Sequence, residues 1–187
     1  REGIFAEVLK GGCIQKGDKI NVIEKEDGPY RVGIITVSDR ASQGVYEDKS
    51  GPVIKELVEE AGMEVIDCLI VPDEKSEIVK KLLHFSDQRQ ADLIFTTGGT
   101  GFSKRDVTPE ATKQVVEREV PGIGEALRSY SMTITPKAML SRQTAGIRGN
   151  TLIINLPGSP KACRENIEYI MKPLKHGLGI LSGRESD

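Results

Sequence analysis

The sequence is poor in aromatic residues and has no excess of positive charge. Its 187 residues include no Trp, and aromatic residues make up only 4% of the chain. Single-stranded nucleic acids are usually bound by stacking their bases on aromatic side chains. Duplex binding normally requires a basic surface, but here 26 Lys and Arg residues face 28 Asp and Glu residues, leaving a net charge of −2. We therefore expect no nucleic-acid partner.

Histidine is equally scarce, with His84 and His176 as its two occurrences. His84 falls within a predicted amphipathic helix, and His176 lies next to Gly177 near a predicted helix end. Neither position follows a strand, so a reaction that needs a histidine base is disfavoured. Transfer of a group to an already ionised phosphate needs no such base, because it depends on positioning and charge neutralisation.

The three cysteines, Cys13, Cys68 and Cys163, are widely spaced. An odd number without close pairs is not typical of a disulfide framework or a zinc site. No apolar run approaches the roughly 18 residues of a membrane span, and the charges spread through residues 1–20 do not fit a secretory signal. We expect a cytoplasmic protein without a membrane segment, with reduced and mostly buried thiols.

The chain alternates between strand and helix patterns from Tyr30 onward. Apolar and β-branched runs predict strands over 31–38, 63–71, 92–97 and 151–156. Helical spacing and start signals predict helices over 52–61, 74–86, 108–120, 123–132 and from Pro160 or Lys161 onward, with Thr108 as a capping hydroxyl before Pro109. This alternation predicts an α/β fold whose mostly parallel sheet is covered on both faces.

Residues 1–29 have a different pattern. Apolar residues over 4–9 and 20–23 predict two short strands, separated by a turn at Gly11-Gly12 and followed by a break at Asp27-Gly28-Pro29. Two short strands cannot bury a core by themselves. We therefore divide the chain into a short N-terminal β appendage, residues 1–29, and a complete α/β domain, residues 30–187.

Ligands of open parallel sheets bind beyond the carboxyl ends of the strands. The predicted third strand ends in a glycine loop, Gly98-Gly99-Thr100-Gly101, whose main-chain N–H groups could approach a phosphate closely. The loop lacks the Lys-Ser/Thr of a P-loop and is not a GxGxxG motif. A tight structural turn is the alternative for the loop taken alone.

Asp73 and Asp106 form the best acidic pair, since one follows a predicted strand and the other follows the glycine loop. Two carboxylates beside a phosphate site are suited to Mg²⁺, which takes one or two carboxylates together with substrate phosphates and water. The alternatives are a helix cap for Asp73 and an ion pair of Asp106 with Arg105 or another base.

Several long motifs carry a resemblance to a known family. In order, they are GIITVSDRASQGVYEDKSGP (33–52), PDE (72–74), TTGGTGFSKRDVTPEAT (96–112), EREVPGIGEALR (117–128) and AMLSRQTAGIRGNTLIINLPGSPKA (138–162). Together they resemble the MogA/MoaB family of molybdenum-cofactor biosynthesis, and the likeness covers about residues 31–180.

The resemblance implies a three-layer α/β sandwich that forms a homotrimer. It also implies molybdopterin adenylyltransferase activity, in which ATP and molybdopterin give adenylylated molybdopterin and pyrophosphate with Mg²⁺. A non-catalytic pterin carrier or scaffold of the same family is the alternative.

The resemblance also assigns residues. Asp73 and Asp106 would be catalytic and would hold Mg²⁺. The nucleotide phosphates would contact the glycine loop together with the end of the first strand, which are Gly98, Gly99, Thr100, Gly101, Ser38 and Asp39. The pterin would contact Ser131, Ser141, Pro157, Gly158 and Ser159. Many relatives carry Asn or Gln where this chain has Ser159, which leaves the role of that serine open.

The N-terminal segment REGIFAEVLKGGCIQKGDKI (1–20) resembles the last strands of a MOSC domain, a module associated with sulfur chemistry of the molybdenum cofactor. The match suggests a possible fused MOSC domain as a further part of the protein. The segment lacks most of such a domain, so we assign it no activity.

Overall fold

The computed structural model describes residues 13, 15–17 and 28–185. The strands predicted over 4–9 and 20–23, and with them most of the proposed MOSC-like segment, lie outside the described residues. In chain order the elements are β1 (Arg31–Val37), α1 (Asp39–Ser42), α2 (Ser50–Glu60), β2 (Glu64–Val71), α3 (Lys75–Leu83), the π-helix η1 (His84–Gln88), β3 (Leu93–Thr97), α4 (Thr108–Val115), β4 (Arg118–Glu119), α5 (Pro121–Met132), the 3₁₀ helix η2 (Pro136–Leu140), β5 (Ala145–Arg148), β6 (Thr151–Leu156) and α6 (Pro160–Ser182).

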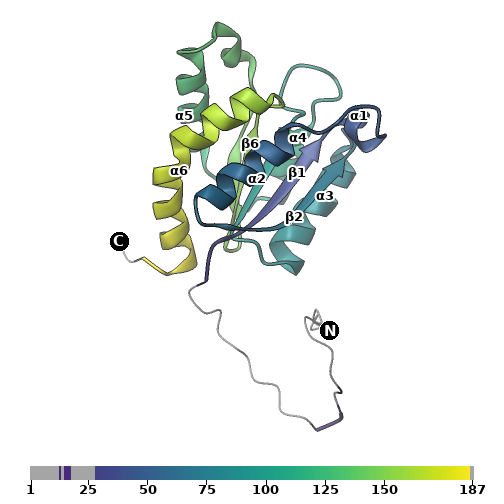
Figure 1. Ribbon diagram of the computed structural model, residues 1–187, viewed down its shortest axis with the longest axis vertical. Coiled ribbons are helices and arrows are strands. Elements are labelled where there is room, and N and C mark those ends of the chain that lie inside the picture. The colour runs from purple at the N-terminus through teal and green to yellow at the C-terminus, as the bar shows by residue number, and fades with distance from the viewer. Residues whose placement is uncertain (1–12, 14, 18–27, 186–187) are drawn as a thin grey trace.

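The strands form one sheet in the order β2-β1-β3-β6-β5-β4 (Figure 1). The first four of these are parallel, which confirms the mostly parallel sheet, whereas β5 runs antiparallel to β6 and β4 runs antiparallel to β5. The two antiparallel strands were not predicted. A two-residue turn at Gly149 and Asn150 joins β5 to β6, with Gly149 at a φ of 53°, a conformation that suits the tight turn of a hairpin.

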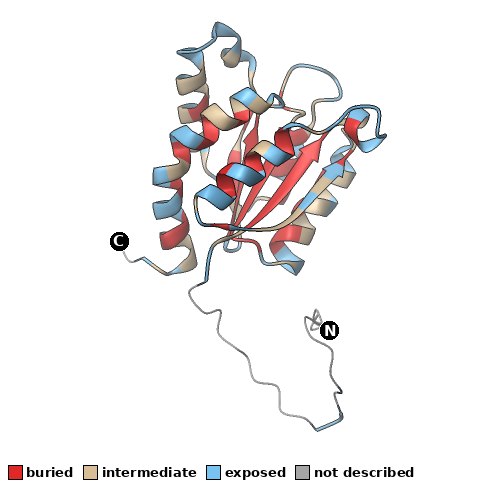
Figure 2. Ribbon diagram, viewed as in Figure 1, coloured by how far each residue is buried: buried red, intermediate tan, exposed pale blue. Residues whose placement is uncertain are grey.

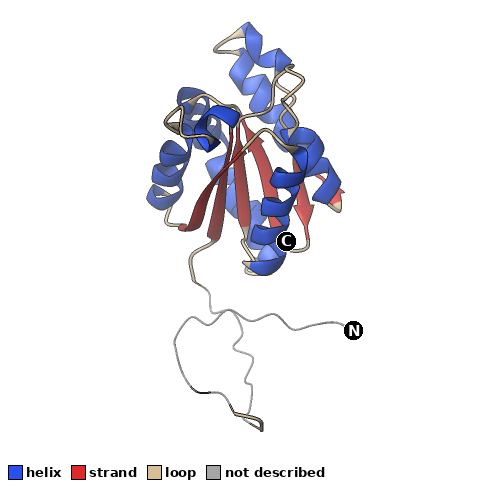
Figure 3. Cartoon of the chain, turned by 90° about the vertical axis from the view of Figure 1, so that its right-hand side faces the viewer, coloured by secondary structure: helices blue, strands red, loops and turns tan. Residues whose placement is uncertain are grey.

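Helices cover both faces of the sheet, so the predicted three-layer sandwich is confirmed (Figures 1 and 3). Successive strand residues point to opposite faces. Ile34 and Phe95 therefore pack in the core beneath α2 and α6, while Ile35 and Ile94 pack in the core beneath α3 and α4. Figure 2 shows the central strands as buried throughout, as expected when neither face of a sheet meets water.

The helix after the glycine loop is shorter than predicted. It ends at Val115, because Val116 is extended and the next residues pair with β5 as strand β4. Pro109 lies in the first turn as expected, but the hydroxyl of Thr108 does not cap the helix. It donates instead to the main-chain oxygen of Gly98 at 2.9 Å, which fastens the start of α4 to the glycine loop.

No helix in the described part of the chain has both the length and the hydrophobicity that a membrane span requires.

All three cysteines are free, but the expectation that they are mostly buried is wrong, because Cys13 and Cys68 are exposed. Cys163 is buried, and this burial raises the pKa of its thiol to about 11, so this thiol stays protonated at neutral pH.

Candidate active site

The ends of three parallel strands meet at Gly98. Its N–H approaches the main-chain oxygen of Leu156 at the end of β6, at 3.4 Å. A Cβ on Gly98 would overlap the main-chain oxygen of Val37 at the end of β1, and its φ of +95° also disfavours any other residue. Glycine is therefore needed here for the loop to cross the sheet edge in contact with both neighbouring strands.

The carbonyl groups of the glycine loop are all fixed by the rest of the chain. Thr108 donates from its hydroxyl to Gly98 and from its N–H to Gly99, at 2.9 and 3.1 Å. Arg142 donates from its N–H to Thr100 and from its Nε to Gly101, at 2.9 and 2.7 Å. No described residue accepts a hydrogen bond from the N–H groups of Gly99, Thr100 or Gly101. The loop thus keeps a row of main-chain donors available for an anion, as in a phosphate-binding nest.

Asp73 and Asp106 lie against this loop. A Cβ built on Gly99 would stand 3.3 Å from Oδ1 of Asp73, and one built on Gly101 would stand 2.8 Å from Oδ2 of Asp106. The predicted pair of acids and the predicted loop are therefore brought together in one place. The absence of side chains at the two glycines is what allows both carboxylates to approach the loop so closely.

Among the described residues, the contacts of these acids match neither a cap of α3 by Asp73 nor an ion pair of Asp106 with Arg105 or another base. The residue that precedes α3 is Glu74, so Asp73 does not cap the helix. Arg105 does not pair with Asp106 but donates to the carboxylates of Asp39 and Glu74, at 2.8 Å from Nη2 and 2.5 Å from Nη1. Asp106 accepts instead from the N–H of Ser103 through Oδ2 at 2.8 Å, which closes the turn after the glycine loop.

The acids differ in their electrostatic surroundings. Asp39 and Asp73 bond reciprocally: the N–H of Asp39 donates to Asp73 Oδ2 at 2.7 Å, and the N–H of Asp73 donates to Asp39 Oδ1 at 3.0 Å. Hydrogen bonds from Arg105 lower the pKa of Asp39. Burial raises the pKa of Asp73, and the nearby charges of Asp39 and Asp106 raise it further. Asp73 therefore carries a negative charge that its surroundings do not fully compensate.

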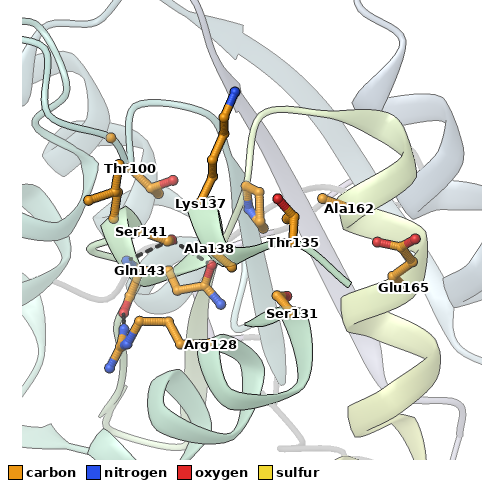
Figure 4. A pocket seen from close by; sticks show the side chains of 13 residues that line it. Thr100, Arg128, Ser131, Thr135, Lys137, Ala138, Ser141, Gln143, Ala162 and Glu165 are labelled. Atoms are coloured by element: carbon orange, nitrogen blue, oxygen red, sulfur yellow. Dashed lines mark hydrogen bonds between the residues drawn. The ribbon is translucent and has the colours of Figure 1, made fainter. Parts of the chain in front are cut away.

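A cavity of about 300 Å³ opens beside the glycine loop (Figure 4). Five of the predicted site residues line it together, namely Thr100, Gly101, Ser131, Ser141 and Pro157. Further polar and charged residues share the wall: Arg128, Thr135, Lys137, Gln143 and Glu165. The cavity therefore combines hydroxyls, two cationic groups and one carboxylate next to the proposed phosphate loop.

A smaller cavity of about 190 Å³ is lined by Gly98 and Gly158 together with Ser38. The hydroxyl of Ser38 accepts from the N–H of Ala41 at 3.2 Å, as an N-terminal cap of α1. Ser159 likewise caps α6 by accepting from the N–H of Ala162 at 3.1 Å. Both serine side chains thus have structural partners, and Ser159 lines neither of these two cavities.

Sequence reasoning missed Arg142. Besides the two loop carbonyls, its guanidinium donates to the main-chain oxygen of Asp106 at 2.5 Å and pairs with Glu110. One side chain thereby joins the glycine loop, the acidic turn and α4. Its only signal in the sequence is its position next to Ser141 in the motif, because the contacts bridge residues more than 30 positions apart.

The family of the chain follows from comparison with known proteins. Residues 33–176 match a family model described as "probable molybdopterin binding domain". The chain belongs to this family. The matched residues include the glycine loop, both acids and both cavities.

Several known proteins are similar to this chain over most of their length. A molybdopterin adenylyltransferase of Helicobacter pylori strain J99 is 46% identical over 154 residues, which cover 81% of this chain and 88% of the relative. The molybdopterin adenylyltransferase of Escherichia coli K12 is 44% identical over 142 residues, covering 75% and 73%. The crystal structure of the molybdopterin biosynthesis enzyme MoaB from Thermus thermophilus superimposes with a TM-score of 0.79 at 46% identity, covering 82% and 97%. The resemblance to MogA and MoaB is thus confirmed.

Proposed function

We propose that this chain is a molybdopterin adenylyltransferase of molybdenum-cofactor biosynthesis. An oxygen of the terminal phosphate of molybdopterin attacks the α-phosphorus of ATP, a new P–O bond forms, and the bond to the departing pyrophosphate breaks. The curated relatives at 44–46% identity that carry this name support the assignment. The attacking phosphate is already ionised, so the scarcity of histidine is no obstacle.

The observation that carries the proposal is the arrangement of the glycine loop. With the carbonyls of Gly98, Gly99, Thr100 and Gly101 bound by Thr108 and Arg142, the free N–H groups are held in advance of binding. Donors fixed in this way stabilise developing charge without having to reorient during the reaction. We assign these groups to the phosphates of ATP.

Asp73 and Asp106 fit the role of magnesium ligands. Among the described residues, no group of three or more acidic, Cys or His side chains forms a complete metal cage. Mg²⁺ is typically held by one or two carboxylates, with phosphates and water completing its shell. Burial and the charges of Asp39 and Asp106 raise the pKa of Asp73, and a cation held nearby would offset both effects. When bound, the ion would supply neutralising charge to the triphosphate and to pyrophosphate.

We assign the cavity of about 300 Å³ beside the glycine loop to the pterin. Ser131 and Ser141 provide hydroxyls for its ring, while Arg128 and Lys137 offer positive charge to the anionic substituents of molybdopterin. Pro157 contributes to the same wall, and Gly158 belongs to the neighbouring loop contact. Ser38 and Asp39 support the site from the end of β1, with their side chains engaged in the contacts described above.

Pyrophosphate release tests this function. The chain, mixed with ATP, Mg²⁺ and molybdopterin, should release one pyrophosphate per adenylylated molybdopterin and none when molybdopterin is omitted. Binding of labelled ATP with and without molybdopterin accompanies the assay. Binding of molybdopterin without pyrophosphate release would instead identify a non-catalytic carrier or scaffold.

The proposal extends to the setting of the protein. We propose a homotrimer that acts in the cytoplasm on small-molecule substrates. A fused MOSC domain, with residues 1–29 as its last part, remains a prediction from the sequence.

A further inference from the structure

Two buried side-chain amides connect the two serines of the larger cavity. Ser141 donates from Oγ to Oε1 of Gln143 at 2.8 Å, and Nε2 of Gln143 donates to Oδ1 of Asn166 at 3.2 Å. Nδ2 of Asn166 then donates to Oγ of Ser131 at 3.0 Å. Gln143 is 3% exposed and Asn166 is fully buried. This amide relay spans α5, the segment before β5, and α6.

The relay gives the two hydroxyls different roles. An amide oxygen only accepts and an amide NH₂ only donates, whereas a hydroxyl does either. Ser141 places its proton on Oε1 of Gln143 and accepts from the N–H of Gln143 at 3.4 Å, so it has one lone pair left to offer a ligand. Ser131 already accepts from Asn166, so its own proton is available to a ligand. Figure 4 shows the side chain of Gln143 between the two serines.

Burial makes this arrangement persistent. A buried amide that loses its partner destabilises the fold, because no water replaces the lost hydrogen bond. Rotation of one amide alone would break the hydrogen bond between Gln143 and Asn166, so the two amides keep their orientation relative to each other. Asn166 does not line the cavity, so any influence it has on a ligand passes through Ser131 or through Gln143.

We propose that Gln143 and Asn166 are positioning residues that set the hydrogen-bond polarity of the cavity, with Ser141 as acceptor and Ser131 as donor. The inference rests on the proposed function and specifies the substrate chemistry. The cavity favours a heterocycle edge that turns an N–H toward Ser141 and a carbonyl oxygen or ring nitrogen toward Ser131. The lactam edge of a pterin carries both kinds of group.

A double-mutant cycle tests the relay by calorimetric titration with molybdopterin and, separately, with ATP. Asn166→Asp keeps an oxygen for Gln143 but presents an acceptor to Ser131, which must then turn its proton away from the cavity. We expect Asn166→Asp to weaken molybdopterin binding by about 10-fold or more and ATP binding by less than about 2-fold. In the Ser131→Ala background, the same change should alter molybdopterin affinity by less than about 2-fold, because residues of one network are not additive.

Additive losses in the cycle would overturn the relay, since they would show that the new carboxylate repels the anionic ligand directly. If Asn166→Asp melts early, Asn166→Ser serves as the second variant, because its shorter hydroxyl cannot reach both partners. It should show the same dependence on Ser131, and equal losses with and without that hydroxyl would refute the proposal. The wild-type chain could fail to release pyrophosphate while the losses of molybdopterin affinity in the cycle remain non-additive. That result would overturn the proposed enzyme activity and leave the relay standing.

Discussion

Replacing Asp106 by Asn separates the proposed catalytic charge from the structural role of the same side chain. In the fold, Asp106 uses Oδ2 to accept from the N–H of Ser103, and no described residue donates to its Oδ1. The amide oxygen of Asn can accept the same hydrogen bond, so the turn after the glycine loop should persist. The difference between a charged and a neutral acceptor is about 1 kcal/mol or less. For a chain of this size, that corresponds to a melting temperature lowered by at most about 2–4 °C.

The expected loss of activity is much larger. Charge stabilisation by a metal ion typically contributes several kcal/mol to a transition state, and Asn offers that ion no negative charge. We expect steady-state pyrophosphate release to fall by at least about 10²-fold, which corresponds to about 2.7 kcal/mol. Asp67→Asn is a matched control, because the carboxylate of Asp67 also accepts a local main-chain hydrogen bond, at 2.8 Å, but follows no ligand loop. Near-normal release from a folded Asp106→Asn chain would refute the assignment.

Four further predictions concern charge, ligand coupling and assembly. Asp73→Asn should abolish pyrophosphate release yet keep or raise the melting temperature at pH 7. The pKa of Asp73 is raised in the fold, so ionisation of this carboxyl at pH 7 opposes folding, and Asn removes that cost. The gain in melting temperature should vanish below the ordinary Asp pKa of about 4, where the carboxyl is protonated in both states. Chelation of Mg²⁺ should weaken labelled-ATP binding by about 10-fold or more; equal affinity without the ion would exclude a carboxylate-held cation. A chain that begins at Gly28 retains the contacts of Arg184 with Gly28 and Tyr30 and should melt within a few degrees of the full chain; an insoluble product would show that residues 1–27 complete the core. Light scattering should give about three times the chain mass of 20.4 kDa, and a monomeric mass would exclude the trimer.

The central sheet could be predicted because strands that are buried on both faces have a recognisable run of apolar residues. β3 and β6 are covered on both faces, so they read as short continuous apolar runs between loop residues. β4 and β5 have no such apolar run, since β4 consists of two exposed residues and β5 has only four residues, one of them a glycine. The pairing of β5 depends on the turn at Gly149 and on β6, and the pairing of β4 depends on β5. A local pattern of apolar residues does not contain this information.

The candidate site was predictable to a similar degree. Because the strands are parallel, the loops that follow them must share one edge of the sheet, which is enough to place Asp73 near the glycine loop. The sequence does not say which groups will hold the loop in shape. Arg142 and Thr108 take this role through contacts decided by the path of the chain around α4 and η2, and the pairing of Arg105 with Asp39 is equally non-local.

The two halves of the proposed phosphate site have opposite effects on an anion. The free N–H groups of Gly99, Thr100 and Gly101 attract an anion, while Asp73 and Asp106 on either side of them repel one. Arg105 does not resolve the conflict, because its donors are already engaged by Asp39 and Glu74. A divalent cation would change the sign of the local field, which makes the acids favourable neighbours of a triphosphate. By linkage, nucleotide and cation must then each strengthen the binding of the other by the same factor. Such a site would bind phosphates without a metal ion weakly, and it would keep the free donors of the loop for the metal-bound nucleotide.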